Sequence, residues 1–207
     1  KSLKKGRKYY ILESIIELNL RKIIKLRELN HLSEVLDAYD TFVIDLWGVM
    51  HDGIKLNDGA MEAVAQLKIK SKKIVFLSNA PRPSAKVVDF LLKMKMNKNY
   101  LSNVMTSGEA AMQAINQNKF GKKFFHLGPS RDSSIFKKVK DNKTEIDDCD
   151  FILCTGLFDE NEDNMDYYKN LLLKHVSKKL VCTNPDLIVH RGNKEEYCAG
   201  YIAKIFE

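Results

Sequence analysis

Two apolar runs of this chain each end in side chains that could handle a phosphoryl group. Asp45 directly follows the run 42–44, and Ser78 and Asn79 directly follow the run 74–77. Buried parallel strands bring their carboxyl ends to one rim of an open sheet, where such folds keep their chemistry. A carboxylate can attack phosphorus, while hydroxyl and amide groups can hold the phosphoryl oxygens. We therefore predict Asp45 as a nucleophile and Ser78 and Asn79 as phosphoryl-binding residues.

Phosphoryl transfer also requires positive charge against the transferred group, which Mg²⁺ normally supplies. Mg²⁺ binds oxygen ligands and keeps several waters. One carboxylate oxygen of Asp45 and the backbone carbonyl of Trp47 are the candidate metal ligands. A strand-end Asp alone, or a Ser-Asn pair alone, is more often a simple turn. Their occurrence together, each after an apolar run, favours the catalytic interpretation.

The elements that would position these residues alternate between strands and helices, which predicts an α/β fold with a parallel sheet. Asn57-Asp58, Ser84 and Ser107 are the predicted helix caps. The predicted strands are 42–45, 74–77, 103–105, 123–127, 150–155 and 179–183. The predicted helices lie within 9–36, after 58, and at 84–95, 108–116, 133–139, 164–175 and 195–206.

This order divides the chain into four parts. Residues 1–38 form a basic helical extension, and 39–106 form the first part of a core with a parallel, doubly wound sheet. Residues 107–185 form a second, inserted α/β unit. Residues 186–207 include a final helix that we expect to return to the first unit.

Charge is concentrated at the start of the chain. The net charge is +7, and residues 1–30 contribute +6 of it through nine Lys or Arg and three Glu. A basic helix could touch RNA, but we favour a solvated extension, because the body of the chain shows no interleaving of basic and aromatic residues. We expect no nucleic-acid partner.

Cysteine, histidine and hydropathy patterns indicate a cytoplasmic protein. The four cysteines form no Cys-x-x-Cys pair, so free thiols in a reducing compartment are expected. The five histidines include no i, i+4 pair that would indicate zinc. No apolar run reaches 18 residues and no secretory signal is recognisable, so no membrane association is expected.

Taken in order, the motifs resemble the haloacid dehalogenase superfamily, class IIA, over about residues 32–207. The resemblance rests on the segments Asp-Leu-Trp-Gly-Val at 45–49, Leu-Ser-Asn at 77–79, Thr-Asn-Pro-Asp at 183–186 and Cys-Ala-Gly at 198–200. It implies a Rossmann-like core, a C2 cap at 107–185, Mg²⁺, and hydrolysis of a small phosphorylated metabolite through an aspartyl-phosphate. It also implies that Asn184 and Asp186 approach the substrate, although a simple turn there is an equal alternative. C2 caps of this family often take part in homodimers.

Two departures from the family pattern limit this expectation. Trp47 stands where most phosphatases of the superfamily have a second Asp that acts as general acid and base, and loss of that help costs about 10²–10⁴ in rate. A catalytically silent phosphometabolite-binding or regulatory protein is therefore the alternative. The Lys and acidic motifs that follow the cap in the family do not occur before Glu207. We therefore expect a fragment with little turnover of its own.

Arg82 follows the second motif and could pair with a substrate anion. A solvated loop arginine is the alternative that we favour.

Overall fold

The computed structural model describes residues 29–207, and the chain divides into one unit that ends at Ala38 and another from Tyr39 to Glu207. The predicted helices before residue 29 lie outside the described residues, as does most of the predicted basic extension. In the first unit the structure shows a 3-10 helix, η1 (Leu32–Ala38). The Glu34 carboxylate accepts the amides of Asn30 and His31 at 2.9 and 3.1 Å, just before this helix.

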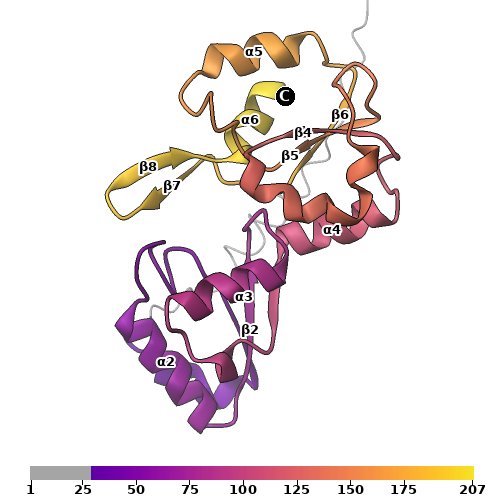
Figure 1. Ribbon diagram of the computed structural model, residues 1–207. Helices are drawn as coiled ribbons and strands as arrows, with labels where there is room; N and C mark the ends of the chain where they lie inside the picture. The colour runs from indigo at the N-terminus through magenta and orange to yellow at the C-terminus, as the bar shows by residue number, and fades with distance from the viewer. Residues whose placement is uncertain (1–28) are drawn as a thin grey trace, which may run out of the picture. The chain divides into compact units, whose positions relative to one another are not determined.

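The second unit begins with a parallel sheet in the order β1-β2-β3, made of β1 (Thr41–Ile44), β2 (Lys73–Ser78) and β3 (Val104–Thr106). The helices α2 (Asp58–Ile69) and α3 (Ser84–Lys93) lie beside it, and η2 (Lys98–Tyr100) leads into β3 (Figure 1). Along β2, Ile74, Phe76 and Ser78 are buried while Lys73 and Leu77 are exposed. This alternation shows that one face of the sheet is covered.

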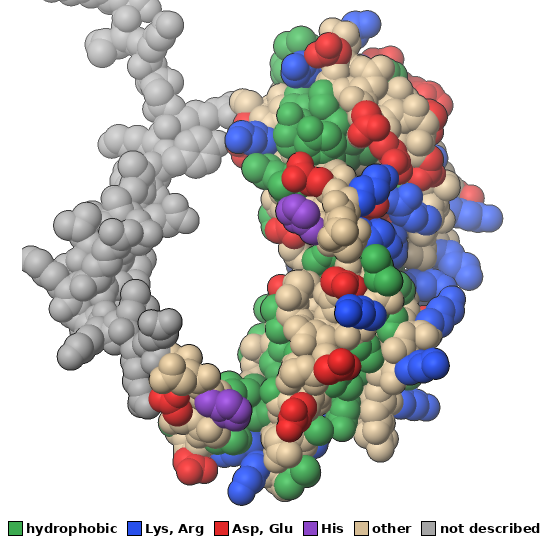
Figure 2. All heavy atoms as spheres, turned by 90° about the vertical axis from the view of Figure 1, so that its left-hand side faces the viewer, with side chains coloured by type: hydrophobic (Ala, Val, Ile, Leu, Met, Phe, Trp, Pro, Cys, Tyr) green, Lys and Arg blue, Asp and Glu red, His purple; other side chains and the backbone are tan. Residues whose placement is uncertain are grey.

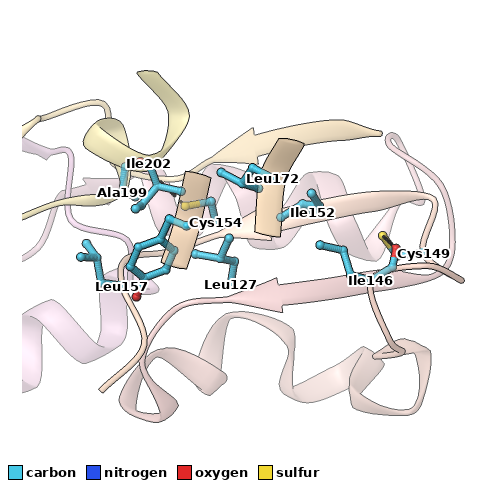
Figure 3. Close-up of a cluster of buried hydrophobic side chains, with 10 residues drawn as sticks. Leu127, Ile146, Cys149, Ile152, Cys154, Leu157, Leu172, Ala199 and Ile202 are labelled. Atoms are coloured by element: carbon cyan, nitrogen blue, oxygen red, sulfur yellow. Dashed lines mark hydrogen bonds between the residues drawn. The ribbon is translucent and has the colours of Figure 1, made fainter. Parts of the chain in front are cut away.

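A second parallel sheet follows in the order β4-β5-β6, made of β4 (Phe124–Leu127), β5 (Phe151–Cys154) and β6 (Lys179–Cys182). All four residues of β5 are buried, because both faces of this sheet are covered. On one face, Ile152 and Cys154 pack with α5 (Met165–Leu173) and α6 (Ala199–Phe206) (Figure 3). On the other, Phe151 and Leu153 pack with α4 (Ser107–Asn116) and with η3 (Ser130–Asn142).

Between β6 and α6 the chain forms an antiparallel hairpin of β7 (Ile188–Arg191) and β8 (Lys194–Tyr197). The predicted helix from Glu195 was therefore wrong at its start, since the helix begins only at Ala199. Gly192 has φ +59° at the first position of the two-residue turn, where a type II′ turn requires positive φ.

The final helix α6 packs on the second sheet, in the cluster that contains Leu127 and Leu172, rather than returning to the first sheet as expected. The predicted domain boundaries themselves stay a prediction.

Three local predictions also need correction. Pro83 and Thr106 hold the N-cap positions that we expected Ser84 and Ser107 to take, whereas the predicted cap at Asn57 is confirmed. Thr106 is the N-cap of α4 because its hydroxyl accepts the Glu109 amide at 3.0 Å. The helix predicted at 133–139 is part of the longer 3-10 segment η3, which non-helical angles at Phe136 and Val139 interrupt.

The fold class is confirmed as α/β with parallel sheets. Within residues 29–207, no helix combines the length and the apolar character that a membrane crossing requires.

Candidate active site

The structure places the predicted nucleophile at the carboxyl edge of the first sheet. Ile44 at the end of β1 lies opposite Phe76 in β2, so Asp45 leaves the sheet at nearly the same level as Ser78. The Asp45 side chain is exposed, and one of its oxygens accepts the backbone amide of Leu46 at 2.7 Å. The carboxylate is thus oriented by its own loop while it remains accessible.

The loop after β2 is held by the side chains predicted to bind phosphoryl oxygens. Ser78 is buried, and its hydroxyl accepts the amide of Ala80 at 3.2 Å. The Asn79 amide group donates to the carboxylate of Asp186, which lies 107 residues later in the chain. The Asp186 amide in turn donates to the side chain of Asn184 at 3.0 Å. The structure therefore joins the second motif to the Thr-Asn-Pro-Asp segment.

A cavity of about 190 Å³ lies above this loop. Of the predicted site residues, Trp47, Ser78, Asn79 and Asn184 line it. Asp45 and Asp186 do not line the cavity. Asp45 accepts the amide of Leu46, which lines it, and Asp186 accepts a hydrogen bond from Asn79, which also lines it. The loops after β4 and β5 contribute Pro129, Thr155 and Gly156 to its lining, and the start of η3 contributes Arg131 and Asp132.

His51 forms a buried aromatic contact beside Asp45. Its ring lies 5.1 Å from the Trp47 ring and 5.5 Å from the Phe90 ring, both edge-on. Burial lowers the pKa of His51, while the nearby carboxylates of Asp52 and Asp45 oppose that shift. His51 Nδ1 accepts the amide of Gly53 at 3.1 Å, which suits the neutral ring.

Arg82 is neither a solvated loop arginine nor a free cation that awaits a substrate anion, because it pairs with a carboxylate of the protein. Its Nε donates to the carboxylate of Asp132 at 2.7 Å, and the Asp132 side chain is only 3% exposed. Burial raises the pKa of Asp132, and the Arg82 guanidinium opposes that rise. Thr155 also bonds Asp132, and the Thr155 hydroxyl lies 2.9 Å from Nε2 of His126. No local sequence pattern indicates this chain of contacts, because its members lie on separate segments.

The donor set around Asp45 fits a metal that needs few protein ligands. Among residues 29–207 no three Asp, Glu, His or Cys side chains gather in a way that could enclose an ion. The Trp47 carbonyl, however, accepts no hydrogen bond from any described residue, and it lies two residues from the accessible Asp45 carboxylate. Mg²⁺ commonly binds through one or two carboxylates, water and a phosphate, so these oxygens are compatible with it.

Comparison with known proteins shows similarity to one family of hydrolases. A family model described as haloacid dehalogenase-like hydrolase matches residues 42–140. A haloacid dehalogenase-like hydrolase from Brucella suis has 29% identity and a TM-score of 0.79, with 86% of this chain and 66% of that one covered. A 4-nitrophenylphosphatase from Thermotoga maritima has 24% identity and a TM-score of 0.58, with 83% and 65% covered.

Two chloroplastic phosphoglycolate phosphatases of Arabidopsis thaliana, 1A and 1B, are each 24% identical to 84% of this chain. The match covers 54% of each, so the chain spans about half the length of these relatives. The family-model match and the shared fold show that this chain is similar to the haloacid dehalogenase-like hydrolases. The Trp-Gly-Val subgroup and the fragment hypothesis stay predictions.

Proposed function

We propose that the complete protein is a Mg²⁺-dependent phosphatase that hydrolyses a small phosphorylated metabolite through a phosphoryl group on Asp45. The observation that carries the proposal is the placement of Asp45, Ser78 and Asn79 at one edge of the first sheet, beside a cavity. The family match supports hydrolysis, and the relatives named as phosphatases support a phosphate ester as the substrate class.

In this mechanism an oxygen of Asp45 attacks phosphorus, and the bond from phosphorus to the leaving oxygen breaks. Water then attacks the phosphorylated Asp45, which releases inorganic phosphate and restores the carboxylate. Ser78, Asn79 and Asn184 line the cavity, and their hydroxyl and amide groups would hold the phosphoryl oxygens. A Mg²⁺ ion on the Asp45 carboxylate and the Trp47 carbonyl would supply positive charge against the transferred group.

The indole of Trp47 cannot donate a proton to the leaving oxygen. The reaction should therefore favour leaving groups that depart as stable anions. This property is the sharpest kinetic signature that the sequence offers.

The remaining parts of the proposal concern context. The second sheet and its helices would act as the C2 cap, since their loops form one wall of the cavity. The cavity volume of about 190 Å³ suits a small metabolite rather than a macromolecule. We further propose a cytoplasmic protein that forms homodimers and binds neither membranes nor nucleic acid.

A leaving-group series on the protein from its complete reading frame tests the proposal. We expect aryl phosphates to be hydrolysed at least about tenfold faster than sugar phosphates, with activity that depends on Mg²⁺ and is abolished by Asp45→Asn. Equal rates for Asp45→Asn and the unaltered protein would refute the role of Asp45.

A catalytically silent phosphometabolite-binding protein is the second candidate, and Trp47 is the observation that favours it. Such a protein would bind inorganic phosphate in a calorimetric titration but would cleave neither aryl nor sugar phosphates. The same leaving-group series therefore separates the two candidates.

A further inference from the structure

Trp47 makes contacts that a lost acid–base residue would not need. Its indole N–H donates to the carbonyl of His190 at 3.1 Å, and the two residues are 143 positions apart. The guanidinium carbon of Arg191 lies over the indole ring, 5.5 Å from its centroid. Trp47 thus binds the β7–β8 hairpin through both its polar edge and its ring face.

The loop after Trp47 is shaped to receive this hairpin. Gly53 has φ +85°, and a Cβ there would lie 2.7 Å from the Trp47 ring, so only glycine leaves room for the indole. At the hairpin turn, the Gly192 amide donates to the carbonyl of Asp52 at 3.3 Å, and a Cβ on Gly192 would meet Ile54 at 2.7 Å. The loop and the hairpin turn therefore also touch next to the Trp47 contact.

The hairpin forms one side of the cavity and supplies charge to it. Arg191 Nε bonds Glu196 at 3.4 Å across the hairpin, and the Arg191 charge acts on His51, as does that of Asp45. Figure 2 turns the hairpin side of Figure 1 toward the viewer and shows basic and acidic side chains interspersed over that face. The hairpin residues that line the cavity are Val189, Arg191, Lys194, Glu195, Glu196 and Tyr197.

We infer that Trp47 is a positioning residue that fastens the β7–β8 hairpin beside the cavity, and that Arg191, held over the indole, binds an oxyanion of the substrate. The Nε of Arg191 is engaged by Glu196, and the rest of its guanidinium is planar and matches the oxygens of a phosphate or carboxylate. The binding role of Arg191 rests on the proposed function, whereas the fastening by Trp47 does not. Trp47, which stands where the family has its proton donor, would thus contribute to substrate binding by holding the hairpin and Arg191 in place.

The fastening can be measured without turnover, by amide hydrogen exchange of the 207-residue chain. Trp47→Ala removes the hydrogen bond and the ring contact, so we expect the Gly192 amide to exchange about tenfold faster. Trp47→Phe keeps a ring but removes the N–H donor and should give a smaller increase. His190→Gln is the matched control, because it keeps the backbone acceptor of an exposed hairpin residue. Unchanged Gly192 exchange in both Trp47 variants would overturn the inference.

Trp47 is the single tryptophan of the chain, so its fluorescence reports on the hairpin if Trp47→Ala fails to fold. Arg191→Gln should shift the Trp47 emission and weaken inorganic phosphate binding about tenfold, whereas His190→Gln should do neither. Identical emission and phosphate affinity for Arg191→Gln and the unaltered chain would overturn the role of Arg191.

Kinetics of the complete protein separate this inference from the proposed function. Arg191→Gln and Trp47→Phe should raise KM for an aryl phosphate more than they lower kcat. If Asp45→Asn abolishes hydrolysis while neither variant changes KM, the binding role of Arg191 fails and the proposed function stands. If hydrolysis does not depend on Asp45, the proposed function fails, and the exchange experiment still decides the role of Trp47.

Discussion

His126 should make the second sheet sensitive to acid. Its ring is only 5% exposed, lies 4.8 Å from the Phe136 ring, and has Nε2 within 2.9 Å of the Thr155 hydroxyl. Burial, helped by the charge of Lys143, lowers the pKa of His126 from 6.5 to about 4. The folded protein therefore holds a neutral ring at a pH where the unfolded chain would already be protonated.

The sign follows from the lowered pKa. Below pH 6.5 His126 binds a proton in the unfolded chain but stays neutral in the folded chain. The free energy of unfolding therefore falls as the pH falls toward 4. At about 1.4 kcal/mol per pKa unit, this loss reaches about 2 kcal/mol near pH 5 and about 3 kcal/mol near pH 4.

Urea unfolding followed by circular dichroism at several pH values tests this. His126→Gln removes the titrating ring, so the stability advantage of the unaltered protein over this variant should shrink by about 2 kcal/mol between about pH 7.5 and pH 5. His190→Gln, at an exposed site, is the control and should show no such change. A difference between the unaltered protein and His126→Gln that stays constant with pH would refute the reasoning.

Two further predictions concern packing and charge. Gly→Ala in a helix normally stabilises by up to about 1 kcal/mol, and Gly59→Ala should do so because its Cβ would meet only the Asn57 side chain at 3.6 Å. Gly200→Ala should instead destabilise by about 1–3 kcal/mol in thermal melts, because its Cβ would overlap the Pro185 carbonyl; a rise in Tm would contradict this. Arg82→Gln should lower the free energy of unfolding by about 1–3 kcal/mol. The loss should exceed that of Asp132→Asn near pH 7, because Arg82→Gln leaves the buried Asp132 carboxylate without its cationic partner, whereas Asp132→Asn leaves an unpaired Arg82 that is 37% exposed. Equal losses of stability in urea would contradict that asymmetry.

The first sheet could be predicted from the sequence because it depends on local signals. The apolar runs before Asp45 and Ser78 fix two strands, and parallel pairing then brings their ends together. The same logic located the strands of the second sheet, whose central strand β5 is a continuous run of buried apolar residues.

The β7–β8 hairpin escaped prediction because two signals competed. Lys194, Glu195 and Glu196 are residues that favour helices, and they outweighed the Gly192-Asn193 pair, which is itself a hairpin signal. Cross-strand pairing, rather than intrinsic preference, decides the outcome there.

Long-range contacts of the site carried no local signal at all. Trp47 could be recognised as a departure from the family pattern, but its bond to His190 depends on a strand that the sequence did not reveal. The pairing of Arg82 with Asp132 likewise joins separate loops over 50 positions. Such contacts follow only from the assembled fold.

The most direct test of the proposed chemistry is to trap the phosphoryl group on Asp45. The complete protein is mixed with p-nitrophenyl phosphate and Mg²⁺, quenched in acid during turnover, and digested for mass spectrometry. We predict that the peptide containing Asp45 gains the mass of one phosphoryl group and that the same peptide of Asp45→Asn gains none. Release of p-nitrophenol from the unaltered protein with no phosphoryl group on that peptide would contradict the assignment of Asp45 as the nucleophile.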